Sequence, residues 1–337
     1  MSIFPQKPVR QTLLASAIAL AITLSACGGG DSSTSSSSTI KSGSATPKNI
    51  IIMISDGASA NTWEMGSYWQ AGVSANQLEA YRNLPVRMGM TTYPLNTSKT
   101  PTNNDTSTVN YDAAKAWDTT VGTADTDKYA TAIEGYKYLK KAYTDSAAAG
   151  TALASGSKTF NNAINYDNYG KPIDYITRIA KAQGKTTGVV TTVNISHATP
   201  ATFAAQNISR YNMPTMAASM LRDGNVDLIM GAGNPDYDSN GVSILGLSST
   251  DCAAKTECKT PYDTIAETEW KELQSGTLAA KGSTTPWTLI QNKSAFEQLA
   301  SGKLSVNGPL IGMPRVRSTL QQARQASVLG SDSNLPS

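Results

Sequence analysis

The chain has 337 residues, of which 39% are hydrophobic and 16% are charged. This balance is typical of a folded globular protein and excludes a chain that is disordered throughout. Lys and Arg number 28 against 25 Asp and Glu, and two of the basic residues, Lys7 and Arg10, lie in an N-terminal leader without acidic residues. The remainder is therefore close to neutral, which argues against nucleic acid as a partner.

The N-terminal segment is typical of bacterial export. The apolar run Leu13–Leu24 is short for a membrane span and suited to a secretory signal, so residues 1–26 are predicted to be a signal peptide. Leu24-Ser-Ala-Cys27 resembles a lipobox, which predicts acylation of Cys27 and a protein anchored to a bacterial membrane, in the periplasm or at the cell surface. An ordinary signal peptide with an incidental cysteine is the alternative. The Gly/Ser-rich residues 27–47 are predicted to form a flexible tether.

Residues 48–337 are predicted to form one folded domain. The apolar, β-branched run Lys48–Gly57 predicts a buried strand with Asp56 at its carboxyl end, where open α/β sheets bind ligands. Residues 91–143 form a long polar insertion, which is predicted to be a peripheral lobe near the mouth of the site. The aromatic side chains of this insertion are interpreted as packing residues rather than as a substrate platform: Tyr111, Trp117, Tyr129, Tyr136 and Tyr138.

The segment Thr144–Gly156 predicts a helix of small residues that starts at Ser146. The first N–H groups of a helix have no intrahelical partner and carry partial positive charge, so an anion is favoured at that end. Ser146 is therefore a candidate nucleophile aimed at phosphate, and a simple N-cap is the alternative. Asp145, its neighbour, is predicted either to cap the helix or to orient a basic side chain.

Further along the chain, strand and helix patterns alternate. A helical pattern covers Pro172–Gln183, with Ile173, Ile176, Ile179 and Ala180 on one face and Gly184 as its stop. The runs Thr187–Val193 and Val226–Met230 predict buried strands. Between them lie three candidate residues, His197, Thr199 and Arg210. Pro200 is expected at the first position of the next helix. The alternation predicts an α/β fold with a mostly parallel sheet that is covered on both faces.

Two further cysteines, Cys252 and Cys258, lie in a polar loop. In an oxidising compartment they could close a small disulfide ring. A zinc pair is less favoured because no histidine or third cysteine is near, and two unpaired thiols remain a third alternative.

Three motifs in order resemble the alkaline phosphatase family, from about Lys48 to Asn234. They are Ile-Ser-Asp-Gly around Asp56, the Ser146 segment with its trailing Lys158–Asn162, and His197-Ala-Thr-Pro with Arg210 downstream. The resemblance implies a three-layer α/β sandwich. It also implies phosphate monoester substrates and a homodimer for the complete protein.

The resemblance also implies roles for the site residues. In that family a serine is phosphorylated during turnover, surrounded by two zinc ions and one magnesium ion. Ser146 resembles this nucleophile and zinc ligand, and Arg210 the bidentate phosphate clamp. Asp56 resembles the aspartate shared by magnesium and one zinc, and Thr199 a magnesium ligand. His197 stands where members carry aspartate or histidine, and it is expected to touch magnesium through water.

One departure from the family is large. His197 is the only histidine in the chain, whereas the zinc sites of the family need several histidines and aspartates. The chain is therefore expected to be the N-terminal portion of an alkaline phosphatase, incomplete at its C-terminus, that supplies the nucleophile half of the site. The alternative is a secreted lipoprotein fragment that binds phosphate or a partner without turnover. A phosphodiesterase or sulfatase is a third interpretation, but the Cys/Ser-x-Pro-x-Arg context of sulfatases is absent around Ser146.

Overall fold

The computed structural model describes residues 48–78, 83–90, 92–104, 112–122, 133–253 and 260–319. The predicted signal peptide, the tether, Cys27 and Cys258 lie outside these residues. The chain divides into two units, Met1–Ile54 and Ser55–Ser337. Among the described residues, no helix has the length and apolar character that a membrane span requires.

In the first unit, residues 48–54 form no strand, and their apolar side chains are exposed, up to 91% for Met53. The prediction of a buried strand over Lys48–Gly57 is therefore wrong. Strand pattern alone does not make a strand, because the backbone N–H and C=O groups must also pair with a neighbouring strand. None of the pairings found among the described residues includes this run.

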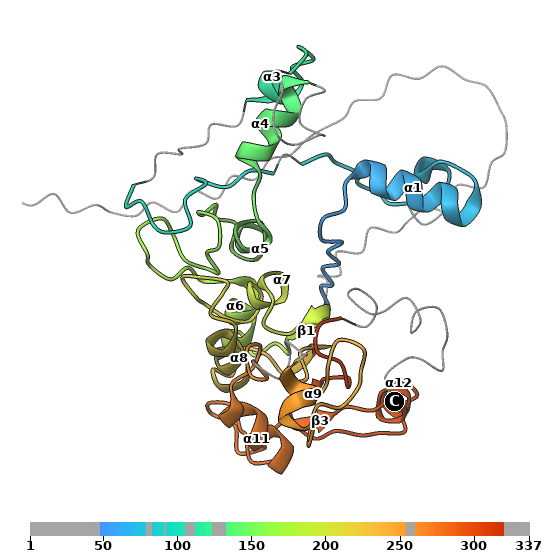
Figure 1. Ribbon diagram of the computed structural model, residues 1–337, viewed down its shortest axis with the longest axis vertical. Helices are drawn as coiled ribbons and strands as arrows, with labels where there is room; N and C mark the ends of the chain where they lie inside the picture. Colours follow the sequence, from blue (N-terminus) through green and yellow to red (C-terminus); the bar gives the residue numbers. More distant parts are fainter. Residues whose placement is uncertain are drawn as a thin grey trace, which may run out of the picture. The chain divides into compact units, whose positions relative to one another are not determined.

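The second unit contains the regular elements (Figure 1). Its helices are α1 (Ala60–Ala71), η1 (Ala75–Gln77), α3 (Ala113–Ala116), α4 (Glu134–Ala142), α5 (Ser146–Ser155), α6 (Ile176–Ala182), α7 (Ala198–Ala201), α8 (Met213–Arg222), α9 (Ser249–Ala253), α11 (Glu267–Ser275) and α12 (Lys293–Ala300). Its strands are β1 (Gly188–Asn194), β2 (Leu228–Ala232), β3 (Thr288–Ile290) and β4 (Leu310–Gly312).

The four strands form one parallel sheet in the order β1-β2-β4-β3. Parallel neighbours need a crossover, and helices α7 and α8 supply it between β1 and β2. The predicted α/β class with a parallel sheet is confirmed. Both strands predicted in this part of the chain exist, with β2 beginning two residues later than expected.

Helices lie on both faces of the sheet, because successive side chains of a strand point to opposite faces. Val189, Ile229 and Ile311 stand in register and are buried in the core with residues of α8 and α11. On the other face, a Cβ added at Gly312 would lie 2.7 Å from the Phe296 ring of α12. Figure 1 shows α12 across the sheet from α8 and α11. That second face is open at β1, where Val190 is 67% exposed.

Two other predictions need correction. Helix α6 begins at Ile176, because the backbone of Pro172 and Ile173 pairs with the loop around Asn165. Ile176 and Ile179, which were expected on one helical face, are exposed and so do not belong to the core. Gly184 has the left-handed φ of +74° that ends a helix, as expected.

In the insertion, the interpretation of the aromatic side chains as packing residues is wrong for Trp117, which is 80% exposed, and for Tyr136. The Tyr138 hydroxyl accepts the Asp112 N–H at 2.6 Å and so links residues 112–122 of the insertion to residues 133–143. Tyr111 and Tyr129 lie outside the described residues.

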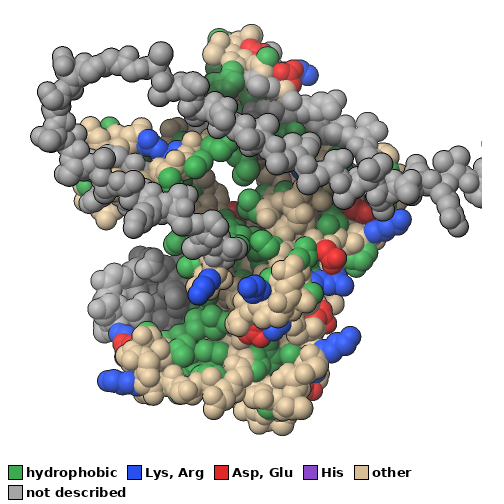
Figure 2. Space-filling view, turned by 180° about the vertical axis from the view of Figure 1, so that it is seen from behind, with side chains coloured by type: hydrophobic (Ala, Val, Ile, Leu, Met, Phe, Trp, Pro, Cys, Tyr) green, Lys and Arg blue, Asp and Glu red, His purple; other side chains and the backbone are tan. Residues whose placement is uncertain are grey.

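Charged side chains are scattered singly on the face in Figure 2, where Lys and Arg alternate with Asp and Glu between hydrophobic side chains. In the polar loop, Cys252 is disulfide-bonded.

Candidate active site

Helix α5 starts as predicted, with Ser146 as its first residue and Asp145 as its N-cap. Asp145 has an extended backbone, and its Oδ1 accepts the Ala148 N–H at 2.9 Å. A carboxylate in this position satisfies one of the free N–H groups at the helix start. The small residues Ala147 and Ala148 are buried, which lets the start of α5 approach its neighbours closely. The hydroxyl of Ser146 is thus held at a fixed, partly positive helix end.

Helix α7 follows the carboxyl end of β1 and lies beside α5 (Figure 1). His197 is its N-cap and Thr199 its second residue. Pro200 is the third residue of the helix rather than the first, so that prediction is wrong by two positions. The difference is tolerated because the first four N–H groups of a helix have no intrahelical acceptor, and proline lacks only its N–H.

Arg210 connects the two helix starts. Its Nη1 donates to Asp145 Oδ2 at 3.1 Å and to Ser146 Oγ at 2.9 Å, and its Nη2 lies 3.3 Å from His197 Nε2. The guanidinium is mostly buried, with 17% of the side chain exposed. Asp145 therefore has both predicted roles at once, because one of its oxygens caps α5 and the other pairs with Arg210.

The protonation state of His197 follows from these contacts. A guanidinium has only donors, so His197 Nε2 must accept, and the ring proton lies on Nδ1. Burial lowers the pKa of His197, and the charge of Arg210 lowers it further, against the opposite effect of Asp56. The imidazole is therefore neutral. Its Nδ1 is buried without a hydrogen-bond partner among the residues that the structure describes.

Asp56 reaches the site through Thr199, whose Oγ1 donates to Asp56 Oδ2 at 2.6 Å. Asp56 is exposed, so this side of the site is open to solvent. The structure thus brings together all six residues that the sequence marked in the second unit: Asp56, Asp145, Ser146, His197, Thr199 and Arg210.

Similarity to known proteins agrees with this arrangement. Residues 124–234 match the family model described as alkaline phosphatase. Alkaline phosphatase 4 of Bacillus subtilis is 48% identical over 100 residues, which cover 28% of this chain and 22% of the relative. Residues 124–234 of this chain are therefore similar to the alkaline phosphatase family.

Other members overlap more of the chain at lower identity. The Escherichia coli alkaline phosphatase is 30% identical over 170 residues, which cover 50% of this chain and 34% of that relative. The solved cold-active enzyme of a Shewanella species is 26% identical with a TM-score of 0.35, over 56% of this chain and 35% of its own. The chain therefore spans about a third or less of the length of these relatives.

The donor set of the candidate site fits magnesium in part and does not fit zinc. Among the described residues, no group of three or more His, Cys, Asp or Glu side chains could hold a metal ion. Zinc needs about four protein or water ligands with several from nitrogen, sulfur or carboxylate, and one neighbouring histidine cannot supply them. Asp56 and Thr199 are adjacent oxygen donors, which magnesium accepts together with water.

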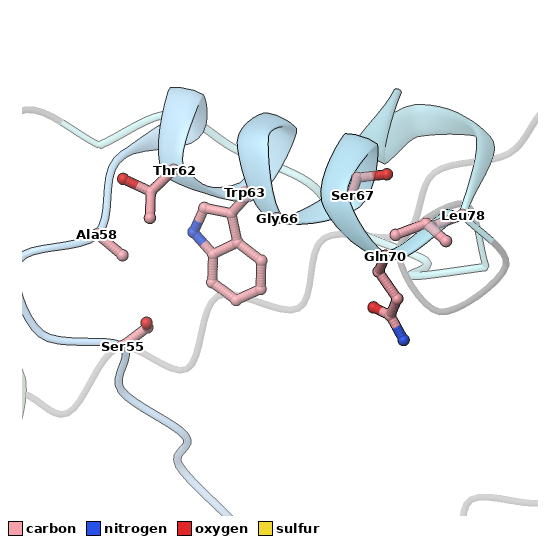
Figure 3. A pocket seen from close by; sticks show the side chains of 8 residues that line it. All are labelled: Ser55, Ala58, Thr62, Trp63, Gly66, Ser67, Gln70 and Leu78. Atoms are coloured by element: carbon pink, nitrogen blue, oxygen red, sulfur yellow. The ribbon is translucent and has the colours of Figure 1, made fainter. Parts of the chain in front are cut away.

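A cavity of about 220 Å³ lies along α1 (Figure 3). Its lining consists of Ser55, Ala58, Thr62, Trp63, Gly66, Ser67, Gln70 and Leu78. The cavity comes close to Asp56 in sequence, but Ser146, His197 and Arg210 do not line it. The candidate site at the starts of α5 and α7 is therefore not part of this cavity.

Sequence reasoning missed two residues that organise the site. Asn161 accepts the Asp145 N–H through its Oδ1 at 3.1 Å, and the backbone of Asn162 contacts both Asp145 and Arg210. Both belong to the Lys158–Asn162 run that resembles the family. Asparagine tolerates the left-handed backbone conformation better than most residues. The Asn161-Asn162 pair in this loop is therefore the sequence signal that could have marked Asn162 as a turn residue.

Proposed function

We propose that this chain supplies the nucleophile half of a phosphomonoesterase site, with Ser146 as the residue that becomes phosphorylated. The observation that carries the proposal is the contact of the Arg210 guanidinium with Ser146 Oγ at the N-terminus of α5. Such a cation beside a hydroxyl at a helix start binds a phosphate group and places its phosphorus next to the hydroxyl oxygen.

The residues of the chain divide the work of binding. The Arg210 guanidinium donates to two oxygens of the bound phosphate, with a planar geometry that lysine cannot reproduce. Because His197 is neutral, it does not repel the Arg210 guanidinium, as a protonated imidazolium would. Asp145 orients Arg210 and keeps α5 capped.

In the chemical step, Ser146 Oγ forms a bond to phosphorus while the bond from phosphorus to the ester oxygen breaks. The departing oxygen takes up a proton from solvent, and the Ser146 proton is released. Arg210 stabilises the negative charge on the equatorial oxygens of the transition state. Attack of water on the phosphoseryl group then releases phosphate and restores the hydroxyl.

Magnesium would be held at Asp56 and Thr199, with water in the remaining positions. Bound there, it would supply positive charge that lowers the pKa of nearby hydroxyl groups and of bound water. Zinc does not fit the donors of this chain, so no step is assigned to it. We expect this chain alone to bind phosphate weakly and to accept phosphate on Ser146 slowly, with negligible steady-state turnover of phosphate esters.

The test is transfer of phosphate from a monoester to the chain, followed by peptide mass spectrometry. Phosphate should appear on Ser146 and disappear in Ser146→Ala, while inorganic phosphate still binds. Ser155→Ala is the matched control, because Ser155 lies at the opposite end of α5 and donates to the Thr151 carbonyl. A phosphate attached to any other residue would refute the assignment.

A fragment that binds phosphate without turnover is the second candidate, and the incomplete donor set favours it. Phosphate binding that depends on Arg210, without phosphoserine at any added metal concentration, would support this candidate over the enzyme. Arg210→Lys should then weaken binding, whereas Arg178→Lys, a change at an exposed ion pair with Asp174, should not.

The anchoring proposal rests on the leader and is independent of the site. Cys27 is proposed to carry lipid that holds the protein to a bacterial membrane. Cells fed a labelled fatty acid should give labelled protein in the membrane fraction, and Cys27→Ser should abolish the label. Soluble, unlabelled protein that begins at another residue would contradict the proposal.

A further inference from the structure

The peptide group of Asn162 lies between the nucleophile helix and the phosphate-binding side chain. Its N–H donates to Asp145 Oδ2 at 3.0 Å, and its carbonyl accepts the Arg210 N–H at 2.8 Å. We propose that Asn162 is a positioning residue that sets the distance between Arg210 and Ser146. The inference rests on the proposed function, since it concerns the binding of phosphate at that site.

The contacts form a closed ring. Asp145 Oδ2 accepts from both the Asn162 N–H and Arg210 Nη1, while the Arg210 backbone is held by the Asn162 carbonyl. Arg210 is therefore held at two points, at its backbone by the Asn162 carbonyl and at its guanidinium by Asp145. The Asn162 N–H in turn holds the same Asp145 carboxylate. A carboxylate that accepts two well-directed donors is fixed in rotation, so the ring also fixes the cap of α5.

The neighbouring backbone holds Asn162 in place. Ile164 and Asn207 exchange two backbone hydrogen bonds at 2.9 Å, which keeps the Asn162 loop beside the segment that leads to Arg210. The Asn161 side chain holds the Asp145 N–H at 3.1 Å. No other described contact links the Asp145 carboxylate to the Arg210 backbone through a single residue.

The ring requires an unusual backbone conformation. Asn162 has a φ of +74°, in the left-handed region, and its side chain is buried. Glycine adopts this conformation freely and asparagine tolerates it, whereas a β-branched residue there is strained. Rotation of Asn162 toward the usual φ would turn its N–H away from Asp145 and its carbonyl away from Arg210.

The experiment compares four variants of the full chain: Asn162→Gly, Asn162→Val, Asn162→Ala and Asn103→Val. Asn103 has a φ of +58° and is the matched control, since its N–H bonds to the Asn168 carbonyl and not to the site. Affinity for inorganic phosphate is measured by phosphorus NMR. Asn162→Val should weaken affinity about tenfold or more, because small displacements of a positioned group are costly.

Rescue separates positioning from general stability. Asn162→Gly should keep phosphate affinity within about twofold, and Asn103→Val should do so despite the same backbone strain. Should Asn162→Val fail to fold, Asn162→Ala carries the same comparison with less strain. Wild-type affinity in a folded Asn162→Val or Asn162→Ala variant would overturn the inference.

A second measurement distinguishes failure of this inference from failure of the proposed function. If the wild-type chain binds no phosphate, the proposed function fails, and the inference is decided by the nitrogen NMR signal of the Arg210 guanidinium. That signal should broaden in Asn162→Val, as pairing with Asp145 is lost, and stay sharp in Asn162→Gly. An unchanged signal in Asn162→Val would overturn the inference on its own.

Discussion

Helices α1 and α5 have similar lengths and both end at a left-handed glycine, Gly72 and Gly156, yet they are buried very differently. Helix α5 buries five residues, all of them small. Helix α1 carries large aromatic side chains but buries only Ser67, and Trp69 is 92% exposed. A helix is therefore buried by fitting its neighbours closely and not by the size of its apolar side chains.

Glycines inside the two helices show the reason. A Cβ added at Gly150 of α5 would lie 2.6 Å from Thr202 Oγ1, whereas nothing lies within 4 Å of a Cβ at Gly66 of α1. Close approach at Gly150 packs the middle of α5 against Thr202, the C-cap of α7, which is the short helix that follows His197 and contains Thr199. The site depends on this close contact between α5 and α7. Among the described residues, Gly66 of α1 makes no such contact.

The largest effect is expected from truncation of one methionine in each environment. Met216 is fully buried in the core, so Met216→Ala should lower the free energy of unfolding by about 2–5 kcal/mol through lost contacts and a cavity. Met65→Ala on exposed α1 should change it by less than about 0.5 kcal/mol. Denaturant unfolding measures both, and equal losses would mean that α1 is buried in solution.

A smaller effect is expected from alkaline pH. Burial, with the charge of Asp223, raises the pKa of Tyr175 to about 12 from its ordinary value of 10.0. The folded state therefore holds a proton that the unfolded chain releases, and stability present below pH 10 is lost as pH rises toward 12. The loss should reach about 2–3 kcal/mol at the upper end of this window.

The phenylalanine variants test this assignment. Tyr175→Phe should remove that part of the alkaline loss, whereas Tyr68→Phe, at an exposed hydroxyl of α1, should leave the wild-type curve unchanged. Urea unfolding at about pH 8, 10 and 11.5 follows the difference in stability between variant and wild type. If the loss of stability at alkaline pH persists in Tyr175→Phe, the loss belongs to other titrating groups.

The smallest effects are expected at the two glycines, and they have opposite signs. Gly150→Ala should destabilise the fold by about 1–3 kcal/mol, because the new methyl group overlaps the buried Thr202 side chain. Gly66→Ala should stabilise it by about 0.5–1 kcal/mol through helix propensity, since the space is open. Thermal unfolding would reveal the signs, and stabilisation by Gly150→Ala would show that α5 and α7 are not closely packed.

Local signals in the sequence predicted several elements well. The helix of small residues begins at Ser146 behind an Asp145 cap, because capping depends on residues that are adjacent in the chain. The strand pattern at Thr187–Val193 and the glycine stop at Gly184 were recognised for the same reason. The motifs also marked the six side chains of the candidate site, although nothing in their spacing gives the distances between them.

Tertiary structure decided what depends on partners distant in the chain. The run Lys48–Gly57 has strand composition but forms no strand, because pairing requires a second backbone. His197 is neutral because folding buries it beside Arg210, and Asn162 joins Asp145 to Arg210 because its loop lies against the segment that follows α7. By itself, the sequence determined the start of α5, the glycine stop at Gly184 and the chemical kind of each site residue. The folded chain alone set the protonation and mutual geometry of those residues, since both depend on the charges and backbone groups that folding brings near.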